Sequence, residues 1–195
     1  MLKFENVYKA FDNKDVLCDI SFKVEKGKTR CFIGPSGCGK TTILNLIAGL
    51  IEVDSGEIIG TMNKKISYVF QEDRLVEGIS AIDNIEMALR NNGALNEFLE
   101  ISHMKKHIDL YPEDMSGGMK KRVNIARAIA FDGDIILLDE PFNGIDEKMA
   151  ETIAQFLKQI LKDKICILVT HDKREAEMLD AEIISMLTKA DYLLK

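Results

Sequence analysis

Along the chain, short apolar runs alternate with segments in which apolar residues recur at helical spacing. Several runs are short and almost entirely apolar, which is typical of strands buried on both faces of a sheet. These runs cover residues 66–70, 135–138, 165–169 and 183–187. Between them, apolar residues recur at helical spacing, most clearly from Met149 to Leu161. Strands and helices alternating in this way predict an α/β fold built on a mostly parallel sheet covered on both faces.

Two further stretches have patterns of their own. Residues 2–34 predict short strands joined by turns, one of them at Lys26–Lys28. From about 79 to 114 the apolar positions turn helical and predict an inserted helical lobe. The chain has 195 residues, which fits one domain with a small subdomain at about 150 residues per domain.

Composition narrows the class of protein. Apolar residues make up 46% of the chain and charged residues 30%, close to the averages for globular proteins. No run approaches the roughly 20 apolar residues that cross a bilayer, and the N-terminus has no apolar signal core. We therefore expect a cytoplasmic protein that reaches a membrane only through a partner.

The charge balance argues against nucleic acid as a partner. The chain carries 26 basic and 32 acidic side chains, a net charge of −6, whereas binding to a phosphate backbone favours a basic surface. We interpret the densest basic run, Lys120–Arg122, as a solvated helix face. His103 and His107 stand four residues apart without an adjacent glutamate, which favours an exposed helix face over a metal site. The four cysteines have no metal-ligand spacing and are interpreted as reduced thiols.

One glycine-rich loop carries a specific chemical signal. It follows an apolar strand, precedes a helix and matches the pattern G-x-x-x-x-G-K-[ST] at every fixed position. Backbone N–H groups at such a helix N-terminus bind a phosphate chain, and glycine lets the backbone approach closely. We expect Lys40 to reach the β- and γ-phosphates, Thr41 to ligate Mg²⁺ and Thr42 to contact the α-phosphate. The loop residues are Gly34, Pro35, Ser36, Gly37, Cys38, Gly39, Lys40 and Thr41.

An apolar strand ending in two acids follows about a hundred residues later. Asp139 and Glu140 close the run at 135–138. In nucleotide hydrolases such a strand places one carboxylate beside the phosphate loop, where it holds Mg²⁺. Acids also end strands at solvent for no chemical reason, but their combination with the loop favours the catalytic interpretation. We expect Asp139 to bind the metal and Glu140 to polarise the attacking water.

A second glycine-containing motif makes the resemblance specific. Met115–Met119 reads Met-Ser-Gly-Gly-Met, and Arg122–Ala128 follows it just before the acidic strand. This order and spacing resemble the signature motif of ABC ATPases, preceded by the family's Tyr-Pro lead-in. By this resemblance Ser116, Gly117 and Gly118 contact nucleotide, although the motif alone also fits a serine N-cap with flexible glycines.

The resemblance assigns roles to four further residues. Phe11 matches the aromatic residue that stacks on adenine, with packing into the small β-region as the alternative. Gln71 matches the glutamine that touches Mg²⁺ and senses the γ-phosphate. Asp146 matches the D-loop aspartate, a role compatible with a plain N-cap of the next helix. His171 matches the switch histidine that contacts the γ-phosphate.

The resemblance covers essentially the whole chain and implies an architecture. It predicts a single ABC ATPase domain over residues 1–195, a P-loop NTPase whose mostly parallel sheet is flanked by helices. An antiparallel β subdomain is expected at the N-terminus. A short helical subdomain is expected from about 79 to 114, together with the start of the signature helix.

The resemblance also implies a mechanism and partners. ATP and Mg²⁺ would lie between the phosphate loop of one subunit and the signature of a second copy or a homologous ATPase subunit. Closure of this dimer would drive transport of a small solute through integral-membrane permease subunits, served by a solute-binding protein. The chain would then sit peripherally on the cytoplasmic face of the membrane.

Some positions point to a subgroup, and others depart from the pattern. Met119 and the segment Gln71–Leu75 resemble importers of the nitrate, sulfonate and taurine type, which suggests a small anion as the solute. Asp12 replaces a common glycine, and the helical lobe is short. The competing interpretations are a different P-loop phosphotransferase or GTPase, an ABC ATPase with a non-transport role, and a nucleotide sensor that does not hydrolyse.

Overall fold

The central element is a five-stranded parallel sheet with strand order β5-β6-β7-β3-β8. We describe it from a computed structural model, which describes residues 1–12, 14–91 and 93–186. The strands are β3 (Lys28–Ile33), β5 (Ile66–Val69), β6 (Ile135–Asp139), β7 (Ile165–Thr170) and β8 (Glu182–Ser185). The four apolar runs therefore form strands as predicted, except that Phe70 and Met186 lie beyond the ends of β5 and β8. Leu187, at the end of the last run, lies outside the described residues.

Burial on both faces explains why β6 and β7 are almost continuously apolar. Every residue of these two strands is buried. Side chains alternate between faces along a strand, and the core divides accordingly. Ile136 and Leu138 belong to a cluster with the helices on one face. Ile135 and Leu137 belong to a second cluster on the other face.

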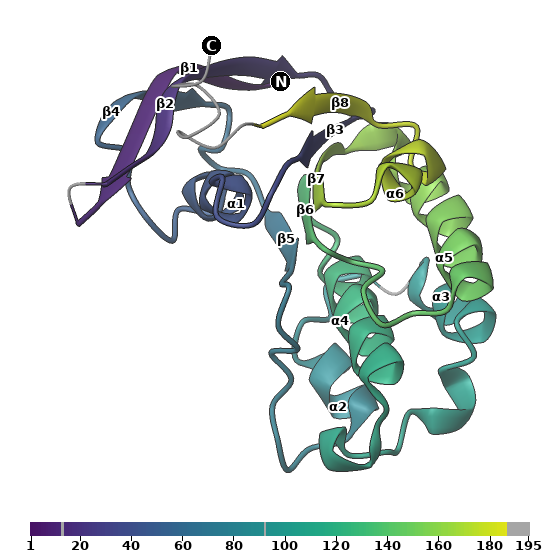
Figure 1. The fold of residues 1–195 in the computed structure, drawn as a ribbon. Helices are drawn as coiled ribbons and strands as arrows, with labels where there is room; N and C mark the ends of the chain where they lie inside the picture. Colours follow the sequence, from purple (N-terminus) through teal and green to yellow (C-terminus); the bar gives the residue numbers. More distant parts are fainter. Residues whose placement is uncertain (13, 92, 187–195) are drawn as a thin grey trace.

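A separate antiparallel sheet with strand order β2-β1-β4 lies at the N-terminal end (Figure 1). Its strands are β1 (Leu2–Phe11), β2 (Lys14–Val24) and β4 (Ser55–Ile59). The alternating residues before position 34 predict β1 and β2, but nothing in the sequence pattern predicts β4. Four of its five residues are exposed, so it has no hydrophobic alternation, and it forms by pairing with β1.

The helices cover the parallel sheet unequally. One face packs against α4 (Gly117–Phe131) and α5 (Glu147–Ile160), and α6 (Lys173–Met178) contacts β7. The other face packs against α1 (Lys40–Ile47) and the antiparallel sheet. None of the described helices is both long and apolar enough to span a bilayer.

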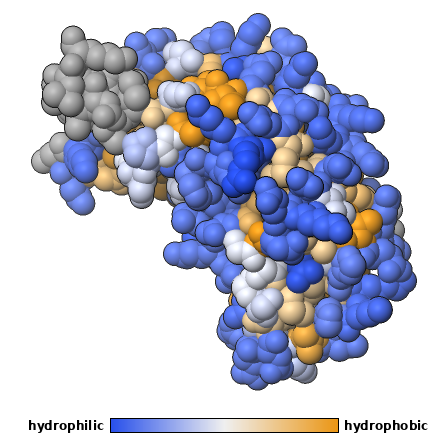
Figure 2. Space-filling view, turned by 45° about the vertical axis from the view of Figure 1, so that its right-hand side comes forward, coloured by the Kyte–Doolittle hydropathy of each residue, from blue (hydrophilic) through white to orange (hydrophobic). Residues whose placement is uncertain are grey.

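The expected helical lobe is present as short pieces rather than long helices. It contains α2 (Ala81–Glu86), α3 (Leu95–Ile101), and 3₁₀ turns at Lys105–His107 and Pro112–Asp114. In Figure 1 it forms a lower arm together with the beginning of α4, away from the antiparallel sheet. Figure 2 shows a mostly hydrophilic surface on which apolar residues form small separate patches.

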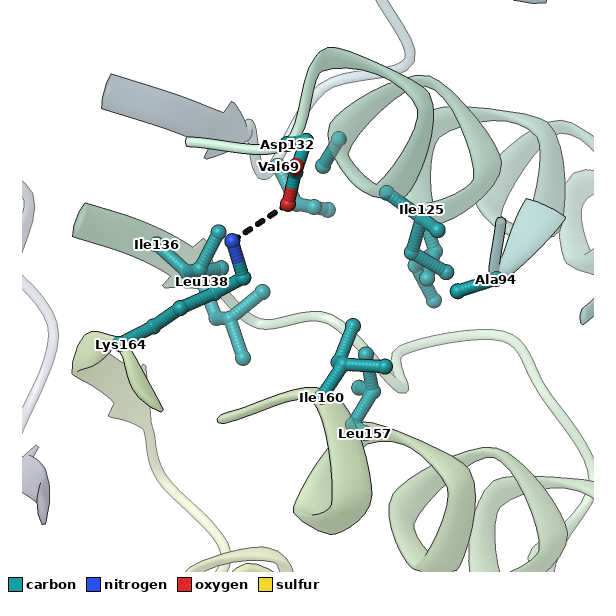
Figure 3. Close-up of a pocket in the computed structure, with 11 residues that line it drawn as sticks. Val69, Ala94, Ile125, Asp132, Ile136, Leu138, Leu157, Ile160 and Lys164 are labelled. Atoms are coloured by element: carbon teal, nitrogen blue, oxygen red, sulfur yellow. Dashed lines mark hydrogen bonds and ion pairs between the residues drawn. The ribbon is translucent and has the colours of Figure 1, made fainter. Parts of the chain in front are cut away.

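A small apolar cavity of about 50 Å³ lies where α4 and α5 meet the parallel sheet (Figure 3). At one side Lys164 Nζ lies 2.5 Å from Asp132 Oδ1, and Lys164 also donates to the Gly133 carbonyl. The pairing with Lys164, followed by a hydrogen bond from Asn91, lowers the pKa of Asp132. The remaining walls are aliphatic and include Val69, Ile125, Ile136, Leu138, Leu157 and Ile160.

Candidate functional site

The carboxyl edge of the parallel sheet brings four distant segments into one row. Parallel pairing aligns Ile33 with Thr170, Val169 with Asp139, and Leu138 with Val69. The segments that follow these strand ends are the glycine-rich loop, His171, Glu140 and Gln71. Ligands of open α/β sheets bind at this edge. The sheet thus gathers residues that are widely separated in the sequence.

The glycine-rich loop leads directly into α1, and its residues Pro35, Ser36 and Gly37 are exposed. Gly39 is the N-cap of α1 and has φ +98°, a conformation that favours glycine, and an added Cβ would stand 2.7 Å from Leu17 Cδ2. No side chain caps α1, and no acidic residue lies in its first turn. The N–H groups of this turn are therefore available to an anion.

Two side chains of the loop segment are turned inward. Lys40 is only 9% exposed, and its Nζ donates to the carbonyls of Gly34 at 2.7 Å and Pro35 at 3.0 Å. Cys38 is 4% exposed and packs in the apolar cluster beneath α1. The Cys38 side chain is therefore buried away from the loop surface. Lys40 places a positive charge at the centre of the loop.

A carboxylate oxygen beside the loop fits a divalent cation. Thr41 Oγ1 donates to Asp139 Oδ2 at 2.9 Å, which joins the start of α1 to the end of β6. Asp139 is 2% exposed, and its Oδ1 has no hydrogen-bond partner among the described residues. Burial raises the pKa of Asp139, while the hydrogen bond from Thr41 opposes that shift. A buried carboxylate oxygen next to a hydroxyl is a suitable donor pair for Mg²⁺.

Glu140 is held by two side chains from the end of β7. The His171 Nδ1 lies 3.0 and 2.9 Å from its two carboxylate oxygens, and Thr170 Oγ1 donates to Oε2 at 3.3 Å. Glu140 is 8% exposed and has φ +47°, whereas the His171 side chain is 73% exposed. The hydrogen bond to Glu140, followed by its charge, raises the pKa of His171. These two contacts fix the orientation of the Glu140 carboxylate at the sheet edge.

Two predicted ligand residues, Gln71 and Phe11, are exposed. Gln71 is exposed and follows β5, the neighbour of β6 in the sheet. Phe11 ends β1 with 44% of its surface exposed, and Lys9 Nζ lies 5.3 Å from its ring centre. The Phe11 ring is therefore not packed into the small β-region. An exposed ring with a cation beside it is suited to stacking on a planar ligand.

The signature residues lie elsewhere on the same chain. Ser116 is the N-cap of α4 and accepts a hydrogen bond from the Met119 N–H at 3.3 Å. Ser116 and Gly117 are exposed. In Figure 1 the N-terminal end of α4 points away from the parallel sheet, whereas its C-terminal end lies near the sheet. Within one chain, the fold therefore does not bring the signature residues to the phosphate loop.

The predicted D-loop residue lies close to the signature in the fold. Asp146 is the N-cap of α5 and accepts from the Met149 N–H at 3.0 Å. The Gly144 carbonyl, two residues earlier, would be 2.7 Å from a Cβ added to Gly118. The start of α4 and the loop before α5 therefore touch, and together they form a second exposed surface.

The interpretation of the basic run as solvated is wrong for its central residue. Lys121 is only 4% exposed, and its Nζ donates to the carbonyls of Phe70 and Gln71. The sequence misses this because helix periodicity alone does not show that a segment fifty residues earlier supplies the acceptors.

The histidine pair is exposed as expected, but not on one helix face. Helix α3 ends at Ile101, His103 has φ +58°, and His107 lies in a 3₁₀ turn. The i, i+4 interpretation is therefore wrong in its geometry. The chain turns between the two residues, because Met104 is buried in the core of the lobe.

Comparisons with known proteins identify the family of the chain. A family model described as "ABC transporter" matches residues 17–143. Among curated proteins, a sulfate/thiosulfate import ATP-binding protein of Escherichia coli K12 is 33% identical over 95% of this chain and 57% of its own length. The corresponding protein of Vibrio cholerae is 34% identical over 95% of this chain and 55% of its own length. The chain thus spans a little over half the length of these relatives.

Two solved structures of one cassette are similar over nearly the whole chain. The dimeric structure of MJ0796, described as a bacterial ABC transporter cassette, has a TM-score of 0.83 and 28% identity. A dimeric post-hydrolysis state of the same cassette, bound to ADP and Pi, has a TM-score of 0.83 and 30% identity. Each covers 95% of this chain and 94% of the matched chain. The cassette fold predicted from the motifs is therefore confirmed.

Proposed function

Because the chain belongs to the ABC transporter family, we propose that it is the subunit that binds and hydrolyses ATP for a transporter. One observation carries this proposal. The fold keeps two exposed surfaces apart, one around the glycine-rich loop and one at the start of α4. Two copies arranged head to tail would complete both surfaces, with the triphosphate between Lys40 of one chain and Ser116 of the other. The dimeric cassettes to which the chain is similar support this arrangement.

ATP would bind first to the sheet edge of one chain. The backbone N–H groups of residues 36–41 and the ammonium of Lys40 would hold the β- and γ-phosphates. Thr42, half-buried in the first turn of α1, would contact the α-phosphate, and the exposed Phe11 would stack on adenine. Thr41, Asp139 and Gln71 would hold Mg²⁺, which supplies neutralisation of phosphate charge.

Hydrolysis would depend on the carboxylate of Glu140. His171 and Thr170 already fix its orientation in the structure, so it can accept a proton from a water aimed at the γ-phosphate. His171 would contact the γ-phosphate from its exposed side. Ser116, Gly117 and Gly118 of the second chain, with its Asp146 nearby, would close the other side of the phosphate.

The transport partner would dock beside the segment that follows β5. A groove of about 320 Å³ lies there, between the end of α1 and the helical lobe. Tyr68 and Phe70 stack at 3.8 Å on its wall, and the Arg74 guanidinium lies 4.0 Å from the Phe70 ring centre. An aromatic wall with an arginine is typical of a protein contact surface. Because Gln71 follows Phe70 directly, a permease seated here would sense the nucleotide.

The solute would be a small anion carried by the permease, delivered by a solute-binding protein. Relatives named for sulfate and thiosulfate import support this class, and the nitrate, sulfonate and taurine type remains the narrower proposal from the sequence. The subunit would then be peripheral on the cytoplasmic face of the membrane.

Substitution of Glu140 tests the proposal. Glu140→Gln keeps the shape and removes the base, so ATP hydrolysis is expected to fall by about 10²- to 10⁴-fold. The variant is expected to elute as a dimer with Mg-ATP and as a monomer without it, in size-exclusion chromatography with light scattering. Glu151→Gln, on the exposed side of α5, is the matched control and is expected to behave as wild type. Native turnover by Glu140→Gln would refute the role of Glu140, and a monomer in saturating ATP would refute the shared site.

A further inference from the structure

The amine of Lys121 occupies a buried position that the proposed chemistry does not use. Its side chain is 5% exposed. Nζ donates to the Gln71 carbonyl at 2.8 Å and the Phe70 carbonyl at 3.2 Å, and it lies 3.7 Å from Asp73 Oδ1. A lysine ammonium has three N–H donors and is rarely buried without partners. These acceptors therefore account for the position of Lys121.

Two more residues of α4 form hydrogen bonds with the segment that follows β5. Asn124 Nδ2 donates to Asp73 Oδ1 at 3.0 Å, and Arg127 donates to the Arg74 carbonyl at 2.5 Å. With Lys121 these residues are spaced three apart, so they lie on one face of the helix. The segment Phe70–Arg74 is thus fastened along two turns of α4 rather than at one point.

The same helix connects this segment to the signature. Ser116 caps the N-terminus of α4, five residues before Lys121 and within the same continuous helix. Rigid secondary-structure elements carry coupling between distant sites, and α4 is a continuous helix of 15 residues. Displacing the backbone at Gln71 therefore displaces Ser116 as well, provided that Lys121 holds the two together.

We propose that Lys121 is a positioning residue that couples the two nucleotide surfaces of one chain. This inference rests on the proposed function, in which Gln71 senses ATP in the chain's own site and Ser116 completes the site of the partner. Lys121 transmits occupancy of one site to the geometry of the other. In a dimer with two such links, ATP hydrolysis is cooperative because each site adjusts the other.

The test compares three single variants. Lys121→Met keeps the length of the side chain and removes the ammonium. Lys121→Arg keeps a charged donor that can reach the same carbonyls. Lys120→Met makes the same chemical change at the half-buried neighbouring position, with no role in the proposed site. ATPase rate against ATP concentration gives kcat and the Hill coefficient, and a fluorescent ADP analogue measures affinity of the single site.

Lys121→Met is expected to bind the ADP analogue like wild type. Its Hill coefficient is expected to fall towards one, and kcat is expected to fall by about two- to thirtyfold, the range found for mutations along coupling networks. Lys121→Arg is expected to restore part of the cooperativity, and Lys120→Met to match wild type. A Lys121→Met enzyme with native kcat and native Hill coefficient would overturn the proposal. Loss of ADP binding together with cooperativity would overturn it too.

Two further variants separate a folding defect, or a failure of the shared site, from a loss of coupling through Lys121. If Lys121→Met does not fold, Asp73→Asn weakens the same contact from a partly exposed side chain, and it must lower the Hill coefficient or the proposal is wrong. If Glu140→Gln fails to dimerise with ATP, the shared-site function itself has failed. That outcome differs from a dimer that forms but hydrolyses without cooperativity.

Discussion

The two adjacent signature glycines are expected to respond oppositely to the same substitution. An added Cβ at Gly117 meets no atom within 4 Å, whereas one at Gly118 stands 2.7 Å from the Gly144 carbonyl oxygen. Neither glycine has a positive φ. Alanine at either position is thus compatible with the backbone, and only the surroundings of the two methyl groups differ.

The contact at Gly118 sets the size of the effect. Ordinary contacts begin near 3.4 Å, so the Gly144 loop must retreat by about 0.7 Å in Gly118→Ala. Overpacking of this kind costs about 1–3 kcal/mol, and the helix preference for alanine returns about 0.5–1 kcal/mol. We expect a net loss of up to about 2.5 kcal/mol, or up to about 10 °C in the unfolding temperature of a domain this size. Gly117→Ala has no contact penalty, so its stability is expected to equal or slightly exceed that of wild type.

Dimer formation with Mg-ATP is expected to be impaired in Gly117→Ala, the variant that keeps its stability. Scanning calorimetry without nucleotide measures stability, and dimer formation with Mg-ATP in the Glu140→Gln background measures the shared site. Gly117→Ala is expected to fold normally yet dimerise poorly, since its methyl group occupies the space that the phosphate of the partner would enter. If Gly118→Ala unfolds at or above the temperature of Gly117→Ala, the packing of α4 against the Gly144 loop is wrong. If Gly117→Ala dimerises as wild type, the role of Gly117 at the shared site is wrong.

Two further predictions concern the core and the histidine. Val69→Ile adds one methyl group towards the 50 Å³ cavity and is expected to raise stability by about 0.5–1 kcal/mol in urea unfolding. Val7→Ile, at a fully buried site outside the cavity, is expected to give no gain; equal gains would mean that the cavity is not the cause. Because Glu140 raises the pKa of His171, their charged pairing is present at low pH and is lost as pH rises through the raised pKa, above 6.5. In an NMR titration the His171 midpoint is expected to move down towards 6.5 in Glu140→Gln, and an unchanged midpoint would disprove the pairing.

Much of the phosphate-binding half of the site is determined by local sequence. The loop ending in Lys40 and Thr41, and the strand ending in Asp139 and Glu140, are recognisable because spacing and strand periodicity are short-range properties. Parallel strands of a sheet end at one edge, so knowing the strands almost suffices to place these residues together. The hydrogen bond between Thr41 and Asp139 is the direct outcome.

Only the tertiary structure shows the contacts between residues that are far apart in the sequence. The burial of Lys121 requires the carbonyls of Phe70 and Gln71, in the segment that follows β5 and 51 and 50 residues earlier, so its sequence neighbours suggested a solvated face. The strand β4 exists because β1 offers it hydrogen bonds, not because its own residues alternate. The separation of Ser116 from Lys40 follows from the direction of α4, which no local pattern encodes. Local sequence determines residue chemistry and periodicity, whereas packing alone determines which distant groups satisfy one another.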